Sequence, residues 1–317
     1  MGKKLRPYRL QLGVTFVFIA LIVIFMFLSP GTFLSKRIYI SFMSTIPFAA
    51  IMALGLTLVI IGGDMDLSFP SVMAIAGYTF SSIFLATGSV LLALVAALAV
   101  GMIAGLVNGL IVVKIGVPSI IATIGTQFFW RGLTTVLCGG MSKSIVQVRD
   151  TAAYQVFVGR IGSVIPAQAV WCLLIAIFLW SILHMHKFGD NIRFIGDNMR
   201  TARIMGINVD LVRILLFVMM GLLTAFSSTL VCFEMANWWP TQGEGYMLLV
   251  FASVFIGGTS VFGGQGTIIG TFVGSLIIGI IEAGLISSGF SGFWTRLIYG
   301  VIVVTSVSVY AVMAKKR

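Results

Sequence analysis

Long apolar runs alternate with short polar breaks along nearly the whole chain. Runs of about 18 or more predominantly apolar residues recur from end to end, each long enough to cross a hydrocarbon core of about 30 Å. The runs are continuously apolar and do not alternate with a period of two, which favours helices over a β-barrel. Because lipid cannot satisfy open backbone groups, the sequence predicts an all-α, polytopic integral membrane protein.

About ten transmembrane helices are predicted, separated by turn signals rich in glycine and proline. The spans cover residues 12–28, 38–61, 67–87, 89–113, 118–138, 167–184, 210–233, 246–262, 267–286 and 293–313. The more polar segments 139–166 and 234–245 are expected to be external loops, the first with room for a short surface helix. We expect a single transmembrane domain over residues 1–317.

Basic residues indicate the orientation of these spans. Lysine and arginine cluster at residues 3–9 before the first run, at 184–208 in a long loop, and at 315–317 after the last run. With an even number of spans, the positive-inside rule places all three clusters in the cytoplasm. Lys36 and Arg37 fall on the outer side, against the rule. The first run has no small-residue cleavage site after it, so we interpret it as a retained span.

Composition supports membrane insertion and excludes several functions. Charged residues make up 9% of the chain, against about 25% in soluble proteins. The net charge of +11 comes from basic residues at span ends and in one loop, so nucleic acid is not an expected partner. Nucleotide-binding, zinc-protease and nucleophile motifs are absent, and the cysteines and histidines lack metal-ligand spacing. We therefore expect that the chain is not an enzyme and that it binds no metal and no cofactor.

A pair of glycine breaks gives the chain a weak internal repeat. Ile61-Gly62-Gly63 recurs as Ile256-Gly257-Gly258, followed by Thr259, each time between two apolar runs. Interrupted hydrophobic segments in the two halves of a chain are typical of a transporter's substrate path. Whether the halves form parallel or inverted repeats is left open. Two further glycine ridges, at 101–109 and 266–274, have four-residue spacing and are most simply interpreted as close helix packing.

Two carboxylates follow the first of these breaks. A carboxylate at the bilayer centre costs about 2.5–3.5 kcal/mol on insertion scales, so Asp64 and Asp66 must meet water, a partner or a polar path. Asp64 is expected in a solvated turn. Asp66 or Ser68 is expected to cap the next helix, with Pro70 near its start, and Asp66 also borders the path.

Other polar residues lie in or beside the apolar runs. Glu282 is expected to face the bundle interior, with Arg296 as a candidate partner, whereas Arg131 and Asn108 are interpreted as structural hydrogen-bonding groups. The loop at 234–245 forms either an interfacial aromatic belt or an external mouth that meets substrate or a docking partner. The residues of this candidate mouth are Glu234, Asn237, Trp238, Trp239 and Glu244.

The basic segment 184–208 is the longest soluble stretch between spans. Asp197 or Asn198 is predicted to cap a short helix that ends at Gly206. Such a helix could act as a lever against a soluble partner. The alternative is a basic loop that lies on anionic lipid.

These motifs together resemble the membrane permease subunits of ribose-type ABC sugar importers, within the branched-chain amino acid/ribose permease superfamily. The resemblance covers nearly the whole chain. It is carried in order by Gly63–Ser68, by Phe188–Ile207, by Gly243–Tyr246 and by the glycine pattern from Gly257 to Gly266. One departure concerns the two carboxylates that the family often has just after the tyrosine, which are Met247 and Leu249 here.

The resemblance implies one half of a transport pore for a monosaccharide or related polyol, with both termini in the cytoplasm of a bacterial cell and the chain in its inner membrane. The implied partners are a second permease chain, same or related, two cytoplasmic ABC ATPase domains, and an external substrate-binding protein. The segment 184–208 would couple to the ATPase through Gly189, Gly196, Asn198, Arg203 and Gly206. The translocation path or helix breaks would involve Gly62, Gly63, Asp66, Ser68, Gly257, Gly258, Thr259 and Glu282.

Three alternatives remain at this stage. The chain could be a secondary transporter driven by an ion gradient, or an importer of a non-sugar small polar solute. It could also be a membrane receptor or scaffold subunit without a transport role, although a scaffold does not need interrupted helices.

Overall fold

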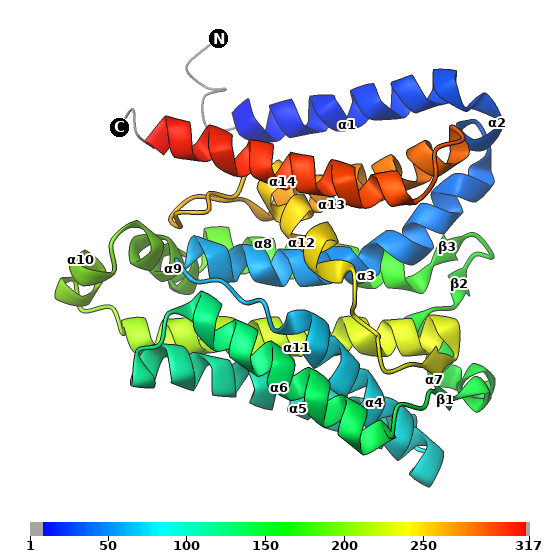
Figure 1. Cartoon of the computed structure of the whole chain (residues 1–317), viewed down its shortest axis with the longest axis horizontal. Coiled ribbons are helices and arrows are strands. Elements are labelled where there is room, and N and C mark those ends of the chain that lie inside the picture. The colour runs from blue at the N-terminus through cyan, green and yellow to red at the C-terminus, as the bar shows by residue number, and fades with distance from the viewer. Residues whose placement is uncertain (1–8, 315–317) are drawn as a thin grey trace.

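The computed structural model describes residues 9–314 and is built almost entirely from α-helices (Figure 1). The basic residues at 3–8 and 315–317, on which the predicted orientation partly rests, lie outside the described residues. The long helices are α1 (Arg9–Leu28), α3 (Lys36–Ile61), α4 (Phe69–Thr87), α5 (Val90–Leu110), α6 (Ser119–Cys138), α8 (Ala167–Met185), α11 (Val209–Met235), α12 (Tyr246–Ile256), α13 (Ile268–Ser287) and α14 (Phe293–Ala314).

Shorter elements connect these helices. Four short helices are α2 (Pro30–Phe33), α7 (Ala152–Phe157), α9 (Lys187–Asp197) and α10 (Met199–Ile204). A π-helical turn η2 (Ile111–Ile115) extends α5, and a 3-10 turn η3 (Val146–Asp150) precedes α7. Two antiparallel pairs involve β1 (Lys143–Ser144) with β4 (Asn237–Trp238), and β2 (Arg160–Ile161) with β3 (Ile165–Pro166).

Seven helices are long and apolar enough to cross a membrane, which confirms an all-α, multi-pass membrane protein. They are α1, α3, α4, α5 with η2, α8, α11 and α13. Two shorter apolar helices, α12 and the segment Phe293–Ser308 of α14, add to them. Helix α6 is as long as α13 but more polar, with Gln127 and Arg131 near its middle, and it is not among the seven.

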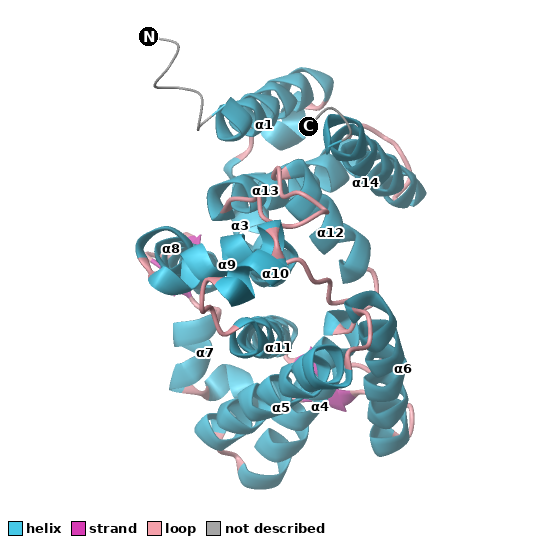
Figure 2. Cartoon of the chain, turned by 90° about the vertical axis from the view of Figure 1, so that its left-hand side faces the viewer, coloured by secondary structure: helices cyan, strands magenta, loops and turns pink. Residues whose placement is uncertain are grey.

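The molecule has two distinct ends (Figure 1). The beginning of α1 and the end of α14 lie at the same end as α9 and α10, and the strands, α2 and α7 lie at the opposite end. The two predicted external loops meet at that opposite end, because the pairing of β1 with β4 joins residue 143 to residue 238. Figure 2 shows α9 and α10 between the group formed by α3, α12 and α13 and the group formed by α11 and α5.

The paired glycine breaks are two copies of the same helix ending. Helices α3 and α12 both stop in a Schellman motif, with Gly63 at φ 86° and Gly258 at φ 89°. In each, the amide of the next residue donates to a carbonyl five residues earlier, over 3.1 Å for Asp64 and 3.2 Å for Thr259. The left-handed conformation at both positions explains why glycine recurs there. The predicted helix breaks are confirmed, but the predicted span 246–262 is six residues too long because α12 ends at Ile256.

The glycine ridges pack helices closely, as predicted. A Cβ added at Gly101 or Gly105 of α5 would collide with backbone carbonyls of α11, at Gly221 and Phe217. The second ridge acts in the same way between α13 and α12, where a Cβ on Gly270 would collide with the carbonyl of Gly257. Small residues therefore set the spacing of two helix pairs.

Candidate functional site

Three segments that are far apart in sequence meet at a contact between glycines, which we call the glycine junction (Gly63, Gly196, Gly263 and Gly264). The amide of Gly264 donates to the carbonyl of Ile61 over 2.9 Å, which joins the end of α3 to the loop after α12. Gly196 of α9 lies against both segments: a Cβ there would collide with the carbonyl oxygen of Ile61 and lie 2.5 Å from the amide nitrogen of Gly264. The predicted coupling segment therefore touches the first helix break and the loop that follows the second break, through backbone atoms.

The segment 184–208 forms two helices where one was predicted. The missed helix, α9, packs its apolar residues Ile192 and Ile195 into the core. Its Gly189 lies against the carbonyls of Ile182 and Leu183 at the end of α8. This close packing fixes the position of α9 relative to α8 and to the core of the helix bundle.

The predicted second helix, α10, has the expected ends. The side chain of Asn198 accepts a hydrogen bond from the amide of Thr201 over 3.0 Å, so Asn198 is the N-cap. Gly206 follows the helix at φ 81°. Ile204 and Met205, at the tip of this segment, are exposed apolar residues.

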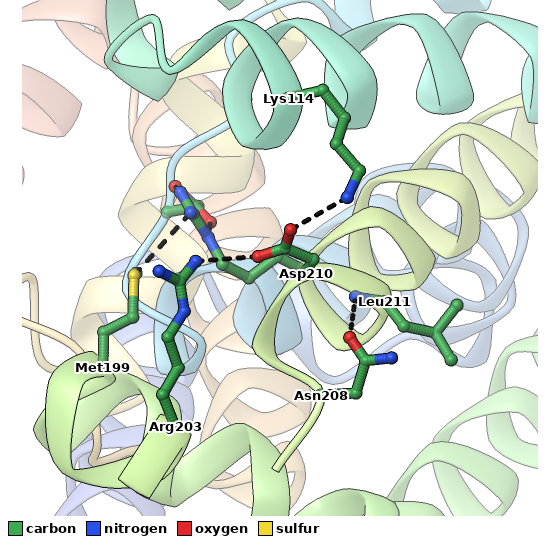
Figure 3. A network of polar contacts seen from close by, with 8 residues as sticks. Lys114, Met199, Arg203, Asn208, Asp210 and Leu211 are labelled. Carbon is green, nitrogen blue, oxygen red and sulfur yellow. Dashed lines mark hydrogen bonds and ion pairs between the residues drawn. The ribbon is translucent and has the colours of Figure 1, made fainter. Parts of the chain in front are cut away.

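A small charge network ties α10 to the spans (Figure 3). Asp210, in the first turn of α11, accepts hydrogen bonds from Arg203 over 2.8 Å and from Lys114 over 2.9 Å. Lys114 belongs to η2, and Asn208 caps α11 by accepting from the amide of Leu211 over 3.1 Å. Of the predicted coupling residues, Arg203 is thus an anchor between α10 and α11.

Asp64 forms a buried ion pair with Arg213. The guanidinium of Arg213 donates to the two carboxylate oxygens over 2.7 and 2.8 Å, and Asp64 is only 4% exposed. A further contact joins Arg213 to the sulfur of Met199 in α10, at 3.8 Å. The predicted solvated turn for Asp64 is therefore wrong, because a partner from α11 removes the need for water.

Asp66 and Ser68 form a second buried polar cluster just before α4. One carboxylate oxygen of Asp66 accepts from the amide and the hydroxyl of Ser68, over 2.8 and 2.6 Å. Asn108 of α5 donates to the Ser68 hydroxyl over 2.7 Å, and Thr126 of α6 donates to Asn108 over 2.6 Å. Ser68 is the N-cap residue of α4 and Pro70 lies in its first turn, as predicted, but no side-chain hydrogen bond caps the helix: the Asp66 carboxylate closes an Asx turn instead.

The candidate external mouth divides into buried and exposed residues. Trp238 is fully buried and donates to the carbonyl of Ala74 over 3.0 Å, so it belongs to no interfacial belt. Asn237, the neighbouring residue in β4, pairs with Ser144 of β1, and Trp239 packs against the core. Glu234 accepts from Gln168 over 3.0 Å, and Glu244 is exposed beside a cavity.

Glu282 does not face the interior of the chain. It is exposed on α13 and accepts a hydrogen bond from Tyr299 of α14 over 3.3 Å. No ion pair with Arg296 is formed within residues 9–314. The predicted interior position and the proposed Arg296 partner are therefore wrong.

Thr259 completes the set of predicted path residues. It is fully buried, and its hydroxyl has no hydrogen-bond partner among the described residues. The hydroxyl lies beside Gly266, where a Cβ would approach it to 2.8 Å. Thr259 thus lies in the loop that leads from the end of α12 to the glycine junction.

A multi-pass bundle with two broken helices, and with a helical segment packed on the first break and on the loop after the second, is typical of a membrane transport protein. The family described as branched-chain amino acid transport system, permease component, matches residues 38–307. The chain belongs to this family: it is the permease component of an ABC importer and not itself an enzyme.

Curated relatives agree over most of the chain. The ribose import permease of Escherichia coli K12 is 33% identical over 294 residues, 92% of this chain and 90% of the relative. The ribose import permease of Bacillus subtilis 168 is 31% identical over 287 residues, 90% of this chain and 88% of the relative. The autoinducer 2 import system permease LsrC of Yersinia pseudotuberculosis YPIII is 29% identical over 273 residues, 85% of this chain and 76% of the relative. No solved structure matches this chain.

Proposed function

We propose that this chain forms one half of the pore of an ATP-driven importer for a monosaccharide or related polyol in a bacterial inner membrane. A second permease chain, same or related, completes the pore. Two ABC ATPase domains bind on the cytoplasmic side, and an external binding protein delivers the solute. The similarity to two ribose import permeases over about nine-tenths of the chain supports this substrate class.

Ten membrane crossings fit this role. The seven long apolar helices, the two shorter ones and α6 together make ten. An even number agrees with the common position of the beginning of α1 and the end of α14 (Figure 1). We place that end, with α9 and α10, in the cytoplasm, and the strand-containing end outside. Residues 1–317 form one transmembrane domain in this proposal.

The glycine junction is the observation that carries the coupling role of α9 and α10. ATPase domains that close on ATP move whatever part of the permease they bind. The exposed Ile204 and Met205 offer an apolar contact at the tip of α10. Because Gly196 touches the end of α3 and the loop after α12, a displacement of α9 reaches both segments without an intervening side chain. Alternating access then follows from movement of the two broken helices.

The variant Gly196→Ala tests this coupling. The added methyl group has no room beside Ile61 and Gly264, so it should separate α9 from the end of α3 and from the loop after α12. In proteoliposomes with ATPase and binding protein, we expect stimulation of ATP hydrolysis by the loaded binding protein to fall by about tenfold. Gly125→Ala is the matched control, because Gly125 has open space around it. Equal stimulation in both variants would exclude the segment 184–208 from coupling.

The LsrC relative gives a second candidate substrate class. Its printed name refers to autoinducer 2, and it is nearly as similar to this chain as the ribose permeases. Competition between labelled D-ribose and autoinducer 2 for ATP-dependent uptake separates the two candidates. Uptake by the purified chain alone in ion-loaded liposomes would instead support a secondary transporter. Complete lack of transport with all partners present would support a receptor or scaffold.

A further inference from the structure

A cavity of about 350 Å³ lies where α4 and α12 begin. Residues of α6 form a third side of this cavity. The lining residues are Pro70, Ser71, Gln127, Phe128, Arg131, Gly243, Glu244, Gly245 and Met247. Its size is at the lower end of the range of about 300–1,000 Å³ that is usual for small-molecule sites.

Arg131 of α6 fixes the walls of this cavity. Its guanidinium donates to the carbonyls of Pro240 and Gln242 over 2.7 and 3.0 Å, and to the carbonyl of Pro70 over 3.0 Å. The start of α4 and the loop before α12 are therefore held by one side chain. These carbonyls carry no formal charge, so Glu244 at the cavity is the nearby carboxylate that balances Arg131.

Ser71 presents a buried hydroxyl without a partner. The side chain is 1% exposed, and its oxygen makes no hydrogen bond within the part of the chain that the structure describes. Thr79 in the same helix donates to the carbonyl four residues earlier, at Ile75. Ser71 makes no such bond, and the Ser68 carbonyl one turn earlier is occupied by the amides of Ser71 and Val72. A hydroxyl that is removed from water in this way is ready to bond a ligand.

We propose that this cavity is a substrate subsite of the pore, built for a neutral, polyhydroxylated solute. The Ser71 hydroxyl, the Gln127 amide and the Glu244 carboxylate bond solute hydroxyls, while Phe128 and Met247 cover its C–H face. One cation and one anion leave the lining without net charge, which disfavours ionic solutes. The proposal rests on the proposed function, because it places a sugar in this pathway.

The cavity includes a point where this chain departs from the family pattern. The residue after Tyr246 is Met247, where the family often has a carboxylate, and it is this residue that lines the cavity. Its apolar thioether offers a surface to a sugar ring.

Uptake of radiolabelled D-ribose into proteoliposomes that hold the complete importer tests the subsite. We expect Ser71→Ala and Gln127→Leu each to lower the sugar moved per ATP hydrolysed by about fivefold or more, the effect of one lost hydrogen bond. Stimulation of ATP hydrolysis by the loaded binding protein should persist, which shows that the variants assemble. Ser82→Ala is the matched control: its hydroxyl is also buried without a partner in α4, but it does not line the cavity.

Two outcomes overturn different claims. If both variants match Ser82→Ala in sugar moved per ATP, the subsite is rejected while the importer function stands. If the unaltered importer accumulates neither D-ribose nor any other monosaccharide or polyol with ATP, the proposed sugar specificity is rejected, and the assignment of the cavity to a sugar falls with it.

Discussion

The two aspartates that follow the first helix break differ in their partners. Asp64 is paired with Arg213, 149 residues away, whereas Asp66 accepts hydrogen bonds from the neutral donors of Ser68 and Asn108. The sequence shows the carboxylates but not these partners. A distant arginine in the first turns of a span has no local signal that links it to a particular aspartate. Asp64 was expected in a solvated turn because its distant partner could not be recognised from the sequence.

The ion pair of Asp64 and Arg213 should contribute strongly to stability. Arg213→Met leaves a carboxylate that is 4% exposed without a cation, and breaking such a pair typically costs about 3–5 kcal/mol. We expect a clear fall in the midpoint of thermal unfolding of the detergent-purified protein. Lys114→Met is the control, because the Lys114 side chain is 57% exposed and should change stability by less than about 1 kcal/mol.

The double variant Asp64→Leu/Arg213→Met sharpens this test. Replacing both charges by apolar groups removes the uncompensated carboxylate, so the double variant should recover part of the lost stability. If Arg213→Met were no less stable than Lys114→Met, the buried ion pair would not exist in the membrane protein.

The cluster around Asp66 makes a second prediction at this scale. Asn108→Leu removes the donor to Ser68 and leaves the buried Thr126 hydroxyl without its acceptor on Asn108, which should cost about 2 kcal/mol. Thr126→Val removes a single hydrogen bond and should cost about 1 kcal/mol. Chemical unfolding followed by tryptophan fluorescence measures both. The reverse order of the two variants would contradict the network.

At the scale of elements, local chemistry made the helix ends predictable. The endings of α3, α10 and α12 all depend on a glycine at a left-handed position, and the sequence shows each of these glycines. Helix α9 was missed because it contains Gly189 and Gly196, which lower helix propensity. Tertiary packing overrides that propensity: the two glycines are the contacts with α8 and with the glycine junction.

Two Gly→Ala substitutions, one in the glycine ridge of α5 and one in α1, are expected to differ in their effect on stability. A Cβ at Gly105 would collide with the carbonyl of Phe217, so Gly105→Ala should push α5 away from α11 and destabilise the protein by about 1–3 kcal/mol. Gly13→Ala in α1 meets open space and should be neutral or stabilise by up to about 1 kcal/mol. Thermal unfolding in detergent measures the two shifts. Shifts of the same sign would argue against close contact between α5 and α11.

At the scale of the whole molecule, hydropathy predicted nearly every long helix but not how the helices meet. The predicted spans agree with α1, α3, α4, α5, α6, α8, α11, α13 and α14 to within a few residues, because an apolar run of membrane length is a strong signal. Contacts between distant segments decide the remaining features: the exposed position of Glu282, the pairing of β1 with β4, and the cavity beside Arg131. Periodicity carries no information on such contacts.

The proposed topology makes a prediction for the complete chain. Four exposed residues lie at helix connections: Leu34 and Val164 at the strand-containing end, and Ile115 and Met205 at the end with α9 and α10. Each is replaced singly by cysteine in the permease expressed without its partners, and the native cysteines, all buried, give little background. A membrane-impermeant thiol reagent should label positions 34 and 164 in intact spheroplasts, and positions 115 and 205 only after permeabilisation. The unsubstituted chain is the control. Labelling of 34 and 115 from the same side would remove a crossing between them, whereas a fully reversed pattern would invert the chain and place α9 and α10 outside, where no ATPase could bind them.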